Sequence, residues 1–181
     1  RNADLCSLAI DNCGRLGDFN GVRSLLIDFR DRKISLSDEA FGFLNISNAT
    51  NEEAKKSITE IVRLLNEVGG SCCNSGIPSL ITMLCSLNSL DLTKFVLEIT
   101  EKRASHYNIL VKHMCVQGKL TEAQNTLLEL SQLGINTNST AYNYLISSLC
   151  VQGRIDEACS IPNKMIDTGC SPDHLSYEIL I

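Results

Sequence analysis

Residues 104–138 read ASHYNILVKHMCVQGKLTEAQNTLLELSQLGINTN, and residues 139–173 read STAYNYLISSLCVQGRIDEACSIPNKMIDTGCSPD. Aligned without a gap, the two stretches are identical at ten of 35 positions. Ordinary composition gives about two or three identities by chance. Both copies contain the run CVQG, at residues 115–118 and 150–153. The chain therefore repeats with a period of 35 residues, which is typical of stacked helical units.

Each copy contains two helical patterns separated by a glycine. In the second copy Tyr142, Leu145 and Leu149 recur at helical spacing, and Gly153 ends this first helix. A second amphipathic pattern follows and stops at Gly169. Two short helices cannot bury their apolar faces alone, so adjacent copies supply the rest of the core. The sequence thus predicts an all-α fold, an α-solenoid of two-helix repeats of about 35 residues.

The remaining residues fit the same phase less closely. We expect degenerate repeats over residues 3–37 and 38–73, a short repeat over 74–103, two well-matched repeats over 104–138 and 139–173, and the start of a further repeat over 174–181. Between the second and third units, the glycine-rich stretch 69–76 predicts a loop. Pro78 is then expected in the first turn of the next helix, where its missing N–H is tolerated.

The composition excludes several classes of protein. Apolar residues make up 44% and charged residues 20%, as in ordinary globular domains. Apolar runs fall far short of the roughly 18 residues that a membrane span needs, so no membrane partner is expected. The formal net charge of −5 argues against nucleic-acid binding through bulk positive charge. The nine cysteines form no C-x-x-C group and are expected to be reduced structural thiols.

The repeated residues resemble the P-type repeats of the pentatricopeptide repeat family. The resemblance rests on YNYLI at 142–146, LCVQGRIDEA at 149–158 and GCSPD at 169–173, within a 35-residue period. Tetratricopeptide repeats differ, because their period is 34 residues and their first helix carries a Trp, which this chain lacks. The resemblance implies a right-handed superhelix of helical hairpins that binds single-stranded RNA in a mitochondrion or a chloroplast.

The resemblance also implies a set of RNA-binding residues. In the family, each repeat reads one base with the residue after the Tyr position and with the last residue of the repeat. Carried over to this sequence, the reading pairs are Asn143 with Asp173, for uracil, and Asn108 with Asn138, for a pyrimidine, with cytosine favoured. The residues that would flank the bases are Thr140 and Leu175. The implied partner is therefore single-stranded RNA with a pyrimidine at the two readable repeats.

Some of these residues have a second interpretation. Asn108 and Asn143 could simply bond locally near the start of a helix, but their recurrence after a Tyr favours base reading. Tyr107 and Tyr142 share the helical spacing of the apolar residues, so we expect them in the core rather than stacked on bases. A further departure is that Val116 and Val151 stand where the family often carries a Lys near the phosphates. The electrostatic share of RNA affinity is therefore expected to be reduced.

No catalytic motif occurs in the sequence. The chain contains no phosphate-binding Walker loop, no G-x-S-x-G and no zinc-deaminase signature. We therefore expect a protein that is not an enzyme, with no cofactor, no metal and no small-molecule substrate.

Two functions remain open on the sequence alone. The first is an organellar RNA-binding protein that reads one base per repeat and acts in RNA processing, stability or translation. The alternative is a helical-repeat scaffold subunit within a larger ribonucleoprotein, such as an organellar ribosome, or within a protein complex. The acidic balance and the irregular N-terminal repeats favour the alternative, whereas the repeated Tyr-Asn pair favours RNA binding.

Overall fold

Helices form every regular element in the part of the chain that the structure describes. The computed structural model describes residues 2–44, 46, 50–135 and 137–181. The chain divides into two compact units, Arg1–Glu101 and Lys102–Ile181. Within the described ranges, no helix is both long enough and apolar enough to cross a membrane.

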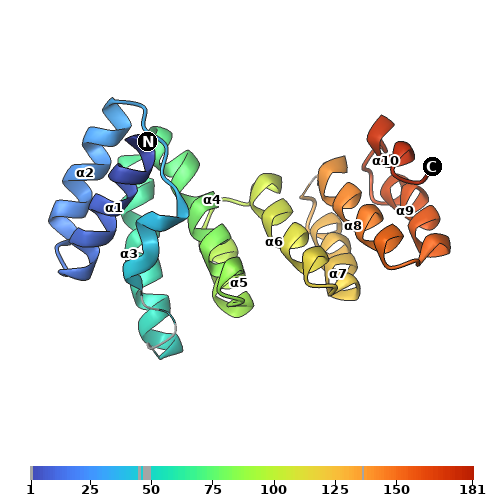
Figure 1. Ribbon diagram of the computed structural model, residues 1–181, viewed down its shortest axis with the longest axis horizontal. Coiled ribbons are helices and arrows are strands. Elements are labelled where there is room, and N and C mark those ends of the chain that lie inside the picture. Colours follow the sequence, from blue (N-terminus) through green and yellow to red (C-terminus); the bar gives the residue numbers. More distant parts are fainter. Residues whose placement is uncertain (1, 45, 47–49, 136) are drawn as a thin grey trace. The chain divides into compact units, whose positions relative to one another are not determined.

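The first unit consists of three helix pairs in two layers (Figure 1). Its elements are α1 (Asn2–Arg15), α2 (Phe19–Asp31), the 3-10 helix η1 (Asp38–Leu44), α3 (Asn51–Val68), α4 (Gly70–Ser86) and α5 (Leu90–Ile99). The first members α1, η1 and α4 pack on one another, and the second members α2, α3 and α5 form the other layer. This stacking of hairpins is the arrangement expected for an α-solenoid.

The start of α3 is fixed by its own sequence. The hydroxyl of Thr50 accepts the Glu53 N–H, and the Glu53 carboxylate accepts the Thr50 N–H, which together make a capping box. The second of these bonds lowers the pKa of Glu53. Beyond the cap, Ile58, Ile61 and Leu65 are buried, as their helical spacing predicts.

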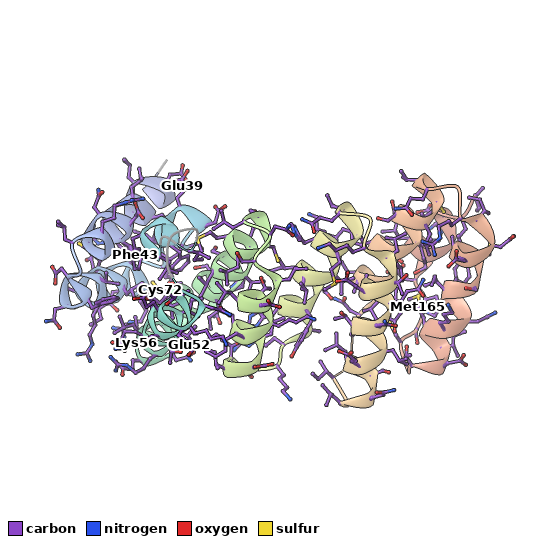
Figure 2. The ribbon with its side chains drawn as sticks, turned by 90° about the horizontal axis from the view of Figure 1, so that it is seen from below. Glu39, Phe43, Glu52, Lys56, Cys72 and Met165 are labelled. Carbon is purple, nitrogen blue, oxygen red and sulfur yellow. The ribbon has the colours of Figure 1, made fainter. Side chains whose placement is uncertain are left out.

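The 3-10 helix η1 contacts α1 at a glycine. A Cβ atom added to Gly14 would lie 2.3 Å from Cγ of Phe43, which Figure 2 labels. Only a residue without a side chain leaves room for that ring, which also stacks edge to face on Phe19 at 6.4 Å between centroids.

The predicted loop over residues 69–76 is wrong. Helix α4 begins at Gly70, immediately after Gly69, whose positive φ of 68° ends α3. Pro78 consequently lies in the interior of α4 rather than in its first turn. Tertiary packing overrides the poor helix propensity of this stretch. The buried Cys72 donates its S–H to Leu26 O at 3.2 Å.

The second unit contains the two well-matched repeats. Its elements are α6 (Ala104–Val116), α7 (Leu120–Gln132), α8 (Ser139–Val151), α9 (Ile155–Asp167) and the short α10 (His174–Glu178). Helices α8 and α9 begin and end 35 residues after α6 and α7, as the sequence period predicts. Helix α8 packs against both α6 and α10, so these first helices form one layer, while α7 and α9 pack behind α6 and α8 (Figure 1).

Leu, Ile and Val side chains fill most of the core of the second unit, together with a few alanine and methionine residues. Ala123 on α7 and Ala158 on α9 are fully buried, so a larger residue at either position would have to displace its neighbours. Met165, which Figure 2 labels, is also fully buried. Helix α9 continues through Pro162 without a break. The all-α fold, an α-solenoid of helical repeats, is thus confirmed.

Candidate nucleic-acid interface

The two predicted reading pairs occupy equivalent places in the second unit. Asn108 lies in the second turn of α6, and Asn143 lies at the same place in α8. Their partners Asn138 and Asp173 are the N-cap residues of the following first helices, α8 and α10. Each pair therefore connects the first helix of one repeat to the start of the next repeat.

The structure brings the side chains of both pairs into contact. Nδ2 of Asn108 donates to Oδ1 of Asn138 at 2.9 Å. Nδ2 of Asn143 donates to Oδ1 of Asp173 at 3.1 Å. Because both amides use their side chains over a separation of 30 residues, the interpretation of these asparagines as merely local helix-start residues is wrong.

Hydrogen bonds keep Asp173 ionised. Its carboxylate accepts the hydroxyl proton of Ser139, the amide N–H of Asn143 and the backbone N–H of Ser176. These three donors, with Ser139 contributing most, hold the pKa of Asp173 well below its ordinary value. The exposed carboxylate is therefore a permanent acceptor at neutral pH.

Ser176, which the sequence analysis did not single out, completes the Asn143 pair. The side chain of Ser176 is fully buried, and its hydroxyl lies 2.7 Å from Oδ1 of Asn143. The same residue forms a capping box with Asp173, since its backbone N–H donates to Oδ1 and its Oγ accepts the Asp173 N–H. The spacing Asp-x-x-Ser at a helix start is a capping signal that the sequence does contain.

The equivalent position beside Asn108 lacks a hydroxyl. Ala141 stands 35 residues before Ser176 and is buried. Oδ1 of Asn108 is shielded from solvent and has no hydrogen-bond partner among the described residues. The two reading pairs therefore share their geometry but differ in how firmly the first amide is held.

The other predicted residues lie at the edge of these pairs or in the core. Thr140 is exposed, and Leu175 is 51% exposed, so both are accessible beside the N-cap residues. Tyr142 is 3% exposed and its hydroxyl bonds Thr168 at 2.8 Å, which confirms it as a core residue. Tyr107 is half-buried.

Acidic residues are absent from α6 and α8, the two long first helices of the second unit. The unit carries six Lys or Arg and seven Asp or Glu residues. Helices α6 and α8 together contain one of these, Lys112, whose ammonium lies over the ring of Tyr144 at 5.4 Å. Helices α7 and α9 carry five acidic residues: Glu122, Glu129, Asp156, Glu157 and Asp167. Helices α6 and α8 are thus close to neutral, whereas the short α10 has the Asp173 carboxylate at its N-cap and carries Glu178.

Among the described residues, the cysteines form no disulfide and no metal-binding cluster is present. All nine cysteines are free thiols. Within the described ranges, no three His, Cys, Asp or Glu side chains come together to hold a metal ion. Burial raises the pKa of Cys115 to about 11, so this thiol is protonated at neutral pH.

Comparison with known proteins identifies the repeats. The PPR repeat model matches residues 105–135, and the PPR repeat family model matches residues 137–181. No curated protein matches the sequence. Among solved structures, the crystal structure of the pentatricopeptide repeat protein PPR10 from maize is similar, with 18% identity and a TM-score of 0.52.

This similarity covers 95% of the chain but 25% of PPR10, so the chain spans about a quarter of that protein's length. At this identity the likeness shows the fold, which extends the helical-repeat architecture across both units. The family assignment rests on the repeat matches, and they cover the helices that carry the reading pairs. The repeats at residues 105–135 and 137–181, which carry the reading pairs, are thus repeats of the pentatricopeptide repeat type.

Proposed function

We propose that this chain binds single-stranded RNA through the layer formed by α6, α8 and α10, with one base contacted by each reading pair. The observation that carries the proposal is the recurrence of a hydrogen-bonded polar pair at the same place in two successive repeats. Single-stranded bases are recognised by hydrogen bonds to their edges, and short amide and carboxylate side chains supply both donors and acceptors. The likeness of its repeats to the pentatricopeptide repeat family favours an organelle, mitochondrion or chloroplast, as the place where the chain acts in RNA processing, stability or translation.

The chemistry of the Asn143 pair suits uracil. Asn143 offers the N–H that Asp173 does not use, and the ionised Asp173 offers acceptor oxygens. Uracil carries an N3–H donor between two carbonyl acceptors, which can bond directly or through a water molecule. In the other pair, Asn108 and Asn138 both have amides that can donate or accept, which is compatible with a pyrimidine such as cytosine.

Phosphate contacts contribute little in this proposal. Val116 and Val151 are 76% and 85% exposed at the ends of α6 and α8, where the family often has a Lys. With Lys112 as the one charged residue on those helices, few counterions are released when RNA binds. We therefore expect affinity to depend on base identity more than on salt concentration.

The test is fluorescence anisotropy of the whole chain with a short, unstructured, pyrimidine-rich RNA and with a purine-rich RNA, each at two salt concentrations. Asn143→Ala is expected to relax the preference for one nucleotide, at a cost of roughly 1–3 kcal/mol as for other base contacts. Asn125→Ala is the matched control, because Asn125 is exposed on α7, outside the first-helix layer. Equal effects of the two substitutions would contradict the proposal.

A scaffold within a larger ribonucleoprotein or protein complex is the second candidate. It is favoured by the exposed Val116 and Val151, and by the first unit, in which fourteen acidic residues outnumber ten basic ones. Absence of RNA binding even at low salt would support this candidate over sequence-selective recognition.

A further inference from the structure

We propose that Ser176 is a specificity-determining residue, which fixes the orientation of the Asn143 amide so that this repeat reads its base with an N–H donor. The inference rests on the proposed RNA-binding function. It concerns a residue that lies outside the repeat it serves, since Ser176 belongs to α10 and Asn143 to α8.

One arrangement of protons satisfies the hydrogen bonds among Asn143, Asp173 and Ser176. The ionised Asp173 can only accept, so the Asn143 group that lies 3.1 Å from its Oδ1 must be the NH2 group. Oδ1 of Asn143 then faces Oγ of Ser176 at 2.7 Å, and two oxygens at that distance need a proton between them. Ser176 supplies that proton. If its hydroxyl turned to Asp173 instead, the buried amide oxygen would face lone pairs.

Rotating the Asn143 side-chain amide by half a turn, so that its oxygen and nitrogen exchange places, is disfavoured at both atoms. The reversed amide would place its oxygen against the Asp173 carboxylate and lose the hydroxyl bond of Ser176. Asn143 is 6% exposed and Ser176 is fully buried, so water cannot easily replace the lost bond. The second N–H of Asn143 is consequently the group that remains to be offered to a base.

The repeat before it provides an internal comparison. Asn108 has Ala141 where Asn143 has Ser176, and its Oδ1 has no hydrogen-bond partner among the described residues. Its partner Asn138 has an amide that can donate or accept. Both amides of that pair can turn over together without losing their mutual bond. The 139–173 repeat should therefore discriminate between bases more strictly than the 104–138 repeat.

Two measurements on the whole chain test this proposal. The first follows the Asn143 side-chain NH2 signals by 15N–1H NMR, with assignment from Asn143→Ala. We expect Ser176→Ala to speed the exchange of these protons with water at least tenfold. The second compares dissociation constants for an oligocytidine and for the same oligomer with one central uridine. We expect Ser176→Ala to reduce the preference for the uridine oligomer at least threefold.

A variant that adds a hydroxyl provides a control, because its expected effect cannot result from loss of folding. Ala141→Ser places a hydroxyl beside the partnerless Oδ1 of Asn108, and we expect slower exchange of the Asn108 side-chain NH2 protons with water. If the wild-type chain binds neither oligomer, the proposed function fails while the NMR result still tests the amide orientation. If the uridine preference is lost in Asn143→Ala but unchanged in a folded Ser176→Ala variant, the role of Ser176 is overturned.

Discussion

Replacing Tyr142 by Phe tests whether Tyr142 stabilises the fold or contacts RNA. The substitution removes one hydroxyl from a side chain that is 3% exposed. That hydroxyl bonds Thr168 Oγ1 at 2.8 Å, and Thr168 in turn donates to Met165 O at 2.9 Å. Thr168 keeps this second bond in the variant, so no donor is left without a partner. The expected loss is therefore the net value of one hydrogen bond, about 0.5–1.5 kcal/mol.

The expected shift in melting temperature depends on how much of the chain unfolds together. If Lys102–Ile181 unfolds by itself, 1 kcal/mol corresponds to about 4–8 °C; if both units unfold as one, it corresponds to about 2–4 °C. Circular dichroism at 222 nm during heating measures the shift. Tyr144→Phe is the matched control, because Tyr144 lies on the same helix and its hydroxyl has no hydrogen bond to a described residue.

RNA affinity should be the same in the Tyr142→Phe variant as in the wild type at a temperature where both are folded. A tenfold loss of RNA affinity without a change in melting temperature would show that Tyr142 contacts RNA. The recurrence of Tyr at this position in both repeats would then not be explained by packing in the core. Equal melting temperatures of the Tyr142→Phe variant and the wild type would refute the energetic role of the Thr168 bond.

Two further properties follow from the ionisable groups. The lowered pKa of Asp173 means that its carboxylate interactions are complete above its unfolded pKa of about 3.9 and are lost only as the pH falls below that value, so the uridine preference should be unchanged between pH 8 and pH 5. A decline of that preference with a midpoint near pH 6, in anisotropy titrations, would show that another group governs the site. Among the thiols, the exposed Cys159 should be alkylated first at pH 8, whereas Cys115, whose pKa is raised to about 11 by burial, should react only after unfolding. Peptide mass spectrometry after brief iodoacetamide treatment distinguishes the two, and early labelling of Cys115 would contradict its burial.

The fold could be predicted where the sequence repeats itself. The 35-residue period places α6 to α9, because α7 and α9 follow the glycine turns at Gly118 and Gly153 and each of the four helices carries its own apolar stripe. The prediction of a loop at the start of α4 was wrong, because Gly, Ser and Asn have poor helix propensity. This helix depends instead on burial against α2 and α3. Residue types alone do not contain that tertiary contribution.

The sequence predicted most residues of the candidate site but not the hydrogen bonds between them. The family pattern named Asn143 and Asp173, and the structure adds that they are hydrogen-bonded to each other. Ser176 was missed because its role depends on a contact between α8 and α10. Its position three residues after Asp173 is the one local signal, and that signal indicates a helix cap rather than a partner for Asn143.

The positions of the N-cap residues affect how a single repeat can be transplanted into another protein. Asp173 closes one repeat and opens the next helix, and the group that orients Asn143 lies still further along, at Ser176. On the proposed role of Ser176, a segment that is to be transplanted with the hydrogen bonds of Asn143 intact must run from residue 139 through residue 176, past the end of its own period. A segment cut at residue 173 would take its third following residue from the next repeat, so the hydrogen bond to Oδ1 of Asn143 would depend on which repeat follows.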